Sequence, residues 1–224
     1  VGADEDGTIA NTSDNKPVTA AFEPGSVNKM ITIAGALEEG TVAPDTHLTV
    51  PDHLQVADHA FTDHDPHPVQ DWSVTDILVT SSNIGTIEIA QRLGAAKVDH
   101  YLRAFGFGAS TGLGFPAEED GIMLPLDRWS GTSIGSIPIG QGIAVTALQL
   151  AAAYNVIAND GVYVAPRLVA ATDKGTGRVD AEPSGRRRVV SEHTAQALRL
   201  MLRQVVSDGT GKKAAVPGYD AAGK

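Results

Sequence analysis

Two side chains able to do chemistry together, those of Ser26 and Lys29, lie three positions apart where a polar loop enters an apolar segment. Residues three apart share one face of a helix, so the Lys29 amine can reach the Ser26 hydroxyl. A serine hydroxyl is a poor nucleophile until a neighbouring base takes its proton. An amine held among apolar side chains loses its charge more readily and can act as that base. The pair therefore predicts nucleophilic catalysis by Ser26.

A helix that begins near Ser26 is needed to align this pair, and the flanking residues predict one. Pro24 and Gly25 suit the turn into a helix, and Gly40 is typical of a helix end. The N-terminus of a helix also favours negative charge developing on Ser26. The apolar residues in between recur at the three- and four-residue spacing of one buried face: Met30, Ile33, Ala34 and Leu37.

A second serine and lysine pair with the same spacing, Ser13 and Lys16, shows how specific the pattern is. Serine and lysine are common, so this spacing arises about once by chance in a chain of this length. Ser13 lies in a polar run that Pro17 follows, which gives no helix to align the pair. We therefore interpret Ser13 as part of a solvated turn and select Ser26 by its context.

Composition limits the class of protein. The 224 residues are 42% hydrophobic, which is enough for a full core, and we expect one domain over residues 1–224. The formal charge of −10, with only two short basic runs, argues against a nucleic-acid surface. The absence of cysteine excludes disulfides and thiol catalysis. No apolar stretch reaches the roughly 18 to 20 residues of a membrane span.

A second polar group lies between two expected helices. Ser73 and Asp76 have the cap-and-acid spacing of a helix start, and an apolar segment follows them. The sequence Ser81-Ser82-Asn83 then interrupts this segment before another apolar-periodic helix. A short turn between two helices holds polar side chains rigidly at the edge of a core, so Ser81 and Asn83 are candidate site residues. An ordinary helix-linking turn is the alternative interpretation.

Residues 40–71 form a long connection that is rich in proline, aspartate and histidine. Imidazole and carboxylate groups are ligands of transition metals, so a metal site is one interpretation. A solvated loop is the other, and we favour it because Pro66 and Pro68 oppose chelation by His64 and His67 together. The alternating residues are His47, Asp52, His53, Asp58, His59, Asp63, His64, Asp65 and His67.

The remaining sequence predicts further helices and strands. Helices are expected over 96–105, over 147–159 after a Thr146 cap, and after a Ser191 cap. Hairpins between the later strands are typical of an antiparallel sheet. Strands are expected at 18–22, 47–50, 54–57, 133–139, 162–172 and 186–190, and the final residues are interpreted as part of another strand.

Taken in order, Ser26-x-x-Lys29, Ser81-x-Asn83 and the final Lys224 resemble the Ser-x-x-Lys, Ser-x-Asn and Lys-Thr-Gly motifs of a penicillin-binding protein transpeptidase domain. The resemblance covers nearly the whole chain, which would end at the first residue of the third motif. It is most similar to the class B, monofunctional division and elongation enzymes, in an actinobacterial-looking variant. The flanks that agree are Glu23-Pro24-Gly25-Ser26, Thr80-Ser81-Ser82-Asn83-Ile84-Gly85, Gly140-Gln141-Gly142 and Gly209-Thr210-Gly211-Lys212-Lys213-Ala214.

The resemblance implies an α+β fold of the serine β-lactamase and transpeptidase type. In that fold an antiparallel sheet is flanked by helices, with an all-α subdomain. It also implies acyl transfer without a cofactor or metal. Ser26 would attack the D-Ala-D-Ala carbonyl of a peptidoglycan stem peptide, D-alanine would leave, and the amine of a second stem would take the acyl group. β-Lactams, which mimic this terminus, would acylate the same serine.

The resemblance assigns a role to each catalytic residue. Lys29 would be the base for Ser26, and Ser81 would relay a proton to the leaving group. Asn83 would orient Lys29 and the substrate amide. The backbone N–H of Ser26 would be one oxyanion donor. Lys224 and Ser82 are expected to bind substrate, with Lys224 on its carboxylate.

The resemblance also implies partners and a location. The partners are peptidoglycan stem peptides, β-lactam antibiotics and wall-synthesis membrane proteins such as a glycosyltransferase. The location is the extracytoplasmic face of the bacterial membrane, through an anchor and a pedestal domain outside this chain. The second oxyanion donor of the family comes from the strand beyond Lys224. We therefore expect the chain alone to be inactive or weakly active.

The same residues allow alternative functions. A D,D-carboxypeptidase would differ only in using water as the acceptor. A serine β-lactamase must hydrolyse its acyl-enzyme quickly, and the Glu-x-x-Leu-Asn sequence of the class A form does not occur here. The non-enzymatic alternatives are a degenerate scaffold or sensor domain and a metal-binding histidine loop. Intact Ser26, Lys29, Ser81 and Asn83 argue against degeneracy.

Overall fold

The computed structural model describes residues 2–3, 9–10, 15–173, 175 and 177–224. Within them, helices alternate with short antiparallel strands, which confirms the α+β class. Ser13 lies outside the described residues, and its partner in the second serine and lysine pair, Lys16, begins helix α1 (Lys16–Thr19). None of the described helices has the length and apolar character needed to cross a membrane.

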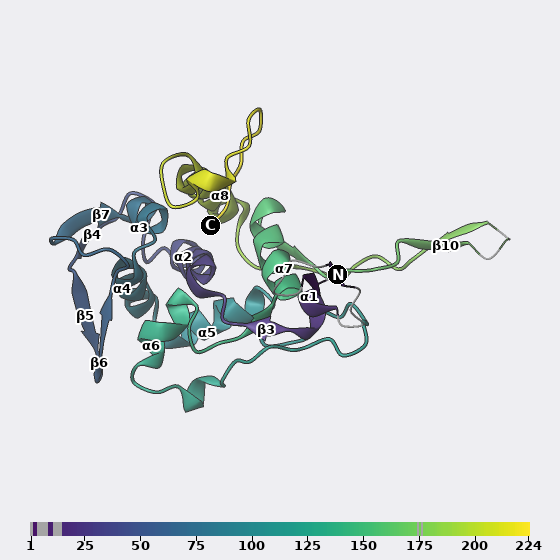
Figure 1. The fold of residues 1–224 in the computed structure, drawn as a ribbon, viewed down its shortest axis with the longest axis horizontal. Helices are drawn as coiled ribbons and strands as arrows, with labels where there is room; N and C mark the ends of the chain where they lie inside the picture. Colours follow the sequence, from purple (N-terminus) through teal and green to yellow (C-terminus); the bar gives the residue numbers. More distant parts are fainter. Residues whose placement is uncertain (1, 4–8, 11–14, 174, 176) are drawn as a thin grey trace.

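The helix predicted after Ser26 is α2 (Lys29–Glu38), and it lies at the centre of the helical body (Figure 1). Its entry, η1 (Gly25–Asn28), is a 3₁₀ turn, so Ser26 precedes the α-helical hydrogen bonding. Residues 29–36 are all buried, because other helices surround this element on several sides. These neighbours are α3 (Val74–Thr80), α4 (Asn83–Leu93), α5 (Ala95–Ala104) and α8 (Glu192–Ser207).

The predicted helix caps are confirmed by their hydrogen bonds. The Ser73 hydroxyl accepts from the backbone N–H of Asp76, whose carboxylate accepts from the Ser73 backbone, and the two form a capping box. Thr146 makes the same arrangement at the start of α7 (Ala147–Ala158). Ser191 caps α8. Each cap pairs backbone N–H groups that the first helical turn leaves without partners.

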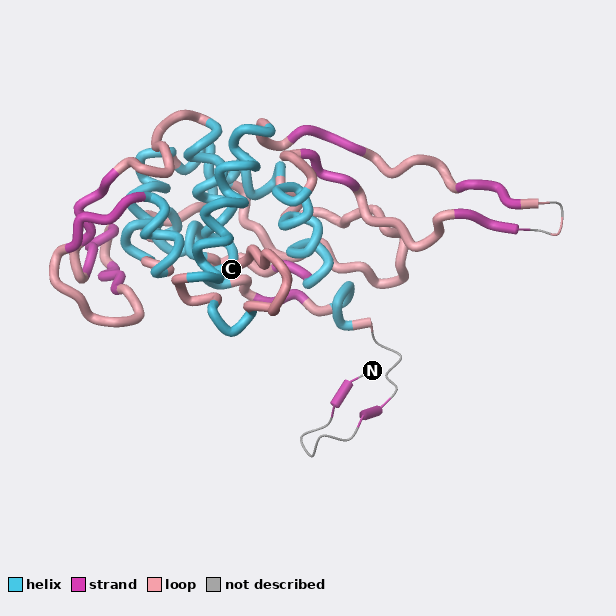
Figure 2. Tube along the Cα trace, turned by 90° about the horizontal axis from the view of Figure 1, so that it is seen from above, coloured by secondary structure: helices cyan, strands magenta, loops and turns pink. Residues whose placement is uncertain are grey.

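The described strands pair two by two, always antiparallel. Two of these pairs occupy the histidine and aspartate connection, which is therefore a ribbon rather than an irregular loop. The β10–β11 hairpin extends away from the helical body (Figures 1 and 2). The pairs are β1 (Gly2–Ala3) with β2 (Ile9–Ala10), β3 (Ala21–Phe22) with β8 (Val145–Thr146), β4 (His47–Val50) with β7 (Gln70–Ser73), β5 (His53–Val56) with β6 (His59–Thr62), β9 (Val162–Val164) with β12 (Arg186–Arg188), and β10 (Ala171–Asp173) with β11 (Arg178–Asp180).

The strand predicted at 133–139 is wrong. This segment forms α6 (Ser133–Ser136) and η3 (Ile137–Ile139). Its alternating apolar residues imitate a strand, but Pro138 has no N–H to donate to a ladder, and no described strand lies beside it. The strand expected at 18–22 is reduced to β3 because α1 takes up its first residues. Two further short turns are η2 (Leu126–Arg128) and η4 (Lys212–Ala214).

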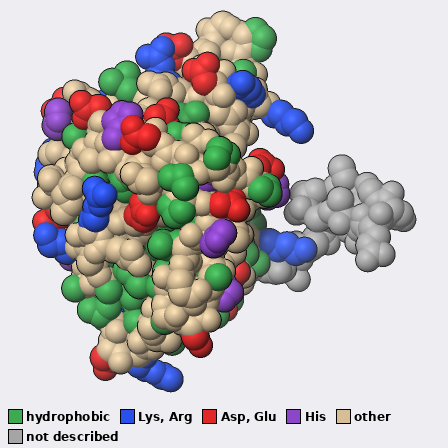
Figure 3. All heavy atoms as spheres, turned by 90° about the vertical axis from the view of Figure 1, so that its left-hand side faces the viewer, with side chains coloured by type: hydrophobic (Ala, Val, Ile, Leu, Met, Phe, Trp, Pro, Cys, Tyr) green, Lys and Arg blue, Asp and Glu red, His purple; other side chains and the backbone are tan. Residues whose placement is uncertain are grey.

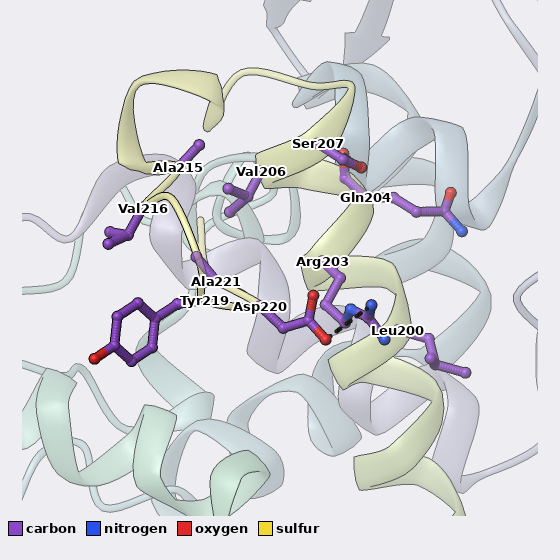
Figure 4. A pocket seen from close by; sticks show the side chains of 10 residues that line it. All are labelled: Leu200, Arg203, Gln204, Val206, Ser207, Ala215, Val216, Tyr219, Asp220 and Ala221. Atoms are coloured by element: carbon purple, nitrogen blue, oxygen red, sulfur yellow. Dashed lines mark hydrogen bonds and ion pairs between the residues drawn. The ribbon is translucent and has the colours of Figure 1, made fainter.

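The final residues do not form the strand that was predicted for them. They fold back along α8, where Arg203 and Asp220 form an ion pair of 3.2 Å (Figure 4). The Gly223 backbone N–H donates to the Leu202 carbonyl at 3.3 Å. A strand needs a hydrogen-bonded neighbour, and none of the described strands lies beside residues 221–224. This path nevertheless brings Lys224 toward the N-terminal side of α2.

Candidate active site

A cleft of ≈ 630 Å³ joins segments that are far apart in the sequence. The 3₁₀ turn before α2, the turn between α3 and α4, the end of β6 and the loop after η3 all contribute to it. Ser26, Ser81 and Asn83, the candidate residues from two separate motifs, therefore line one cavity. The lining residues are Gly25, Ser26, Thr62, Asp63, His64, Asp65, Thr80, Ser81, Asn83, Ile139, Gln141 and Thr210.

Lys29 is the centre of the hydrogen bonds beside this cleft. Its side chain is 0% exposed. The Nζ atom donates to the Ser81 carbonyl at 2.5 Å, to Asn83 Oδ1 at 2.7 Å and to Ser81 Oγ at 3.3 Å. A buried lysine without such acceptors would carry a large desolvation cost. The structure thus brings Lys29, Ser81 and Asn83 into one polar cluster.

The charge state of Lys29 is set by opposing effects. Burial lowers its pKa to about 7, the positive charge of Lys224 acts in the same direction, and the Asp63 carboxylate acts against both. A substantial fraction of the amine is therefore neutral near pH 7. A neutral amine can keep two donated hydrogen bonds and still offer a lone pair to a hydroxyl proton.

Ser26 lies one turn before Lys29 and is exposed in the cleft. Its hydroxyl makes no hydrogen bond to another described residue, so it is open to an incoming group. Two hydrogen bonds from other elements hold the turn that carries Ser26. Buried Asn28 donates to the Ile137 carbonyl at 2.9 Å, and the Tyr154 hydroxyl donates to the Val27 carbonyl at 3.0 Å.

The turn between α3 and α4 presents Ser81 and Asn83 through an uncommon backbone conformation. Ser81 has a φ of 66° in the left-handed region, which costs a non-glycine residue on the order of 1 kcal/mol. This conformation ends α3 and directs the Ser81 carbonyl to Lys29. Asn83 opens α4, and its Nδ2 donates to the Thr62 carbonyl at 2.9 Å while its Oδ1 accepts from Lys29.

The two residues expected to bind substrate lie in different surroundings. Lys224 Nζ donates to Thr210 Oγ1 at 3.2 Å, beside the cleft, and burial lowers its pKa to about 8. Ser82 is 2% exposed and is not among the cleft residues. Its hydroxyl accepts from the Gly85 N–H at 2.9 Å and donates to Asp63 at 2.7 Å, so it caps α4 and has no free donor for substrate.

The Gly140-Gln141-Gly142 turn forms the wall of the cleft beside Ser26. The Gly25 N–H donates to the Gly140 carbonyl at 2.9 Å. Gly140 has a φ of 83°, and a Cβ there would lie 2.1 Å from the Gly25 carbonyl oxygen. Only glycine permits both this conformation and this approach. The turn thereby holds Gln141 at the edge of the cleft.

Sequence reasoning missed the part played by the histidine and aspartate connection. Histidine and acidic side chains are scattered over the face shown in Figure 3, which is the side of the molecule where β4 to β7 lie in Figure 1. Among the described residues, no three histidine or acidic side chains are grouped as a metal site. The solvated-loop interpretation is wrong for Asp63 and His67, whose side chains are 7% and 11% exposed. No sequence spacing could have placed them against α4, because the contact depends on how the β5–β6 hairpin packs.

The fold and this geometry define a protein with an exposed serine one turn from a buried lysine, in a cleft shared with a Ser-x-Asn turn. The family model described as the penicillin binding protein transpeptidase domain matches residues 3–224, and the chain belongs to this family. The resemblance drawn from the motifs is therefore confirmed.

Individual proteins similar to this chain are penicillin-binding proteins and transpeptidases as well. Penicillin-binding protein PbpB of Mycolicibacterium smegmatis is 44% identical over 219 residues, covering 94% of this chain and 34% of that protein. Peptidoglycan D,D-transpeptidase FtsI of Escherichia coli is 32% identical over 215 residues, covering 95% and 34%. Penicillin binding protein 3 of Mycobacterium tuberculosis, complexed with ampicillin, is 40% identical with a TM-score of 0.90, covering 93% and 48%. The chain spans about a third of the length of the curated relatives it matches.

Proposed function

We propose that this chain forms the transpeptidase domain of a peptidoglycan D,D-transpeptidase that acts through an acyl-enzyme on Ser26. The observation that carries the proposal is the fully buried Lys29, whose amine contacts Ser81 and Asn83 one turn from the exposed Ser26. An amine with a pKa of about 7 is a usable base at neutral pH. Family membership and the name of the Escherichia coli relative support the same reaction.

The proposed reaction has two steps. Lys29 takes the Ser26 proton as Oγ attacks the carbonyl carbon of the penultimate D-alanine, and the Ser26 backbone N–H stabilises the oxyanion. The C–N bond to the terminal D-alanine then breaks, and a proton passed through Ser81 reaches the leaving amine. In the second step the amine of another stem peptide attacks the Ser26 ester, giving the cross-link and the free hydroxyl. With a β-lactam the reaction would stop at the acyl-enzyme on Ser26.

One cation beside the cleft, Lys224, is the group that we propose binds the substrate carboxylate. A D-Ala-D-Ala terminus carries a carboxylate, which an ammonium group attracts. The contact of Lys224 with the cleft residue Thr210 supports this role. We propose that the protein works at the extracytoplasmic face of the membrane with wall-synthesis proteins such as a glycosyltransferase. The D,D-carboxypeptidase alternative shares the first step, and the products formed with an added acceptor amine distinguish the two.

Covalent labelling tests the proposal. The full-length protein, which includes the strand expected beyond Lys224, is purified and incubated with a fluorescent penicillin, and the adduct is measured by gel fluorescence and intact mass. Ser26→Ala should lose the label with an unchanged circular dichroism spectrum, because an exposed hydroxyl contributes little to packing. Ser13→Ala, in the other serine and lysine pair, should keep it. No label on the wild type would favour a scaffold domain, and label retained by Ser26→Ala would assign the nucleophile to another residue, with Ser81 next.

A further inference from the structure

The Asp63 carboxylate, at the end of β6, is fully occupied by donors. Oδ2 accepts from Ser82 Oγ at 2.7 Å and from His67 Nε2 at 3.0 Å. Oδ1 accepts from the backbone N–H groups of Asn83 and Ile84, the latter at 3.0 Å. These are the first N–H groups of α4, which have no partner inside the helix and favour an anion. A side chain from a distant hairpin thus anchors the start of the helix that carries Asn83.

His67 holds this carboxylate from the other side. Its Nδ1 lies 2.7 Å from the Pro68 carbonyl, and its Nε2 lies 3.0 Å from Asp63. Both partners are acceptors, so the two contacts together require the doubly protonated imidazolium. The Pro68 hydrogen bond and then the Asp63 carboxylate raise the pKa of His67 above its ordinary value, against the effect of burial. The ring also packs against Trp72, with centroids 4.9 Å apart.

Two consecutive residues, Thr62 at the end of β6 and Asp63 after it, hold both the side chain and the backbone of Asn83. Thr62 accepts from the Asn83 side-chain amide at 2.9 Å, and Asp63 accepts from the Asn83 backbone. With both held, the carboxamide can turn only its oxygen to Lys29, at 2.7 Å. A hydrogen-bonded path therefore runs from His67 through Asp63 and Asn83 to the Lys29 amine.

We propose that Asp63, supported by the charged His67, is a positioning residue that fixes Asn83 and thereby the Lys29 amine. The inference rests on the proposed function, since it assumes that Lys29 is the base for Ser26. The charged and titratable groups near the pair are Asp52, which accepts from the His67 backbone N–H at 3.0 Å, and His53 beside Asp52. Lys29 is the other, and the charges of Asp63 and Lys224 both act on it.

Asp63→Asn separates positioning from simple stability. It keeps the shape of the side chain but replaces one acceptor oxygen by a donor facing Ser82 and His67. The acylation rate with fluorescent penicillin at its high-pH plateau should fall by about ten- to a hundredfold, because misplacement by about 1 Å can cost a hundredfold. Removing the negative charge that raises the Lys29 pKa should also move the rising limb of the pH–rate profile to lower pH. The shift of the limb reports the lost charge, and the fall in the plateau reports positioning. A role limited to stability would leave the plateau rate of the folded variant unchanged.

His47 and Asp71 provide the matched control. They form a histidine and aspartate pair at 3.2 Å on the neighbouring β4–β7 ribbon, with side chains 56% and 74% exposed. His47→Gln and Asp71→Asn should leave the plateau and the limb unchanged. If the wild type is labelled and Asp63→Asn has the same plateau rate, the inference is overturned and the proposed function is not. An unlabelled wild type would instead overturn the proposed function.

His67→Gln decides the question if Asp63→Asn does not fold, as judged by thermal melting. It can still donate one hydrogen bond to Asp63 but lacks the charge and the second contact. Its acylation rate should be several-fold below the wild-type rate in mildly acidic buffer, where wild-type His67 is protonated. The ratio should approach one as the pH rises above the His67 pKa, because the wild type then loses the same contact. A ratio that stays constant with pH, or equals one throughout, would overturn the inference.

Discussion

A single buried ammonium group determines the chemistry of this molecule at the residue scale. Lys29 has no exposed surface, yet three acceptors surround its Nζ atom. Burial and the Lys224 charge favour the neutral amine and the Asp63 carboxylate favours the charged one, and the resulting pKa of about 7 lies near the middle of the physiological range. The effect of Lys224 on that pKa makes the second lysine part of the same electrostatic system.

Lys224→Met tests this coupling at the residue scale. The acylation rate of the wild type should rise with pH through about 7 and then level off, because only neutral Lys29 can take the Ser26 proton. Removing the Lys224 charge, which lowers the Lys29 pKa, should move that limb to higher pH. Stopped-flow labelling across pH measures it, with Lys213→Met on the exposed η4 as the control. A limb that stays in place in Lys224→Met would contradict the coupling.

At the scale of elements, the two helices α3 and α4 and the turn between them form a unit that local signals define at each boundary. The Ser73 capping box begins α3, the left-handed Ser81 ends it, and the Ser82 hydroxyl caps α4. Since each boundary is fixed by a hydrogen bond or a backbone conformation, the turn cannot shift along the chain. Ser81 and Asn83 are therefore held in register with Lys29.

Ser73→Ala tests the contribution of one boundary. Loss of the cap leaves first-turn N–H groups without a partner and should reduce the free energy of unfolding by about 1 kcal/mol. Urea denaturation followed by circular dichroism measures the change. Ser184→Ala, in the connection between β11 and β12, should stay within about 0.5 kcal/mol of the wild type. Equal losses in the two variants would show that the cap is not what stabilises α3.

At the scale of the whole molecule, one carboxylate joins α2, the helix that carries Lys29, to the start of α8. Glu38, in the last turn of α2, accepts from the Ser191 backbone N–H at 2.9 Å, the Ser191 hydroxyl at 2.8 Å and the Thr194 hydroxyl at 2.6 Å. Burial alone would raise the pKa of Glu38, but these hydrogen bonds, that of Thr194 first, lower it.

Glu38→Gln should therefore weaken the packing of α8 on α2. We expect a loss of about 1–3 kcal/mol in the free energy of unfolding at neutral pH, since a charged acceptor of three donors is replaced. The folded pKa lies below the unfolded one, so the stabilisation is complete above the unfolded pKa and is lost as pH falls through the folded pKa. Urea titrations at neutral and acid pH measure the difference, with exposed Glu119→Gln as control. A difference that does not shrink in acid would contradict this account.

The sequence by itself determined the features that depend on near neighbours in the chain. The Ser26 and Lys29 spacing and the caps at Ser73, Thr146 and Ser191 follow from interactions within a few residues. The single buried face predicted for α2 does not, because other helices bury residues 29–36 on all sides. The order of the motifs was enough to indicate the family.

Tertiary structure decided the rest, because burial and long-range hydrogen bonds have no periodic signature in a sequence. Residues 133–139 carry the alternation of a strand, but they lack a partner strand and pack as helical turns under Asn28. The sequence around Asp63 and His67 predicts a solvated loop, whereas the packing of the β5–β6 hairpin buries their side chains at the start of α4. The pKa of Lys29 likewise depends on how far the surrounding helices exclude water, which only the packed structure fixes.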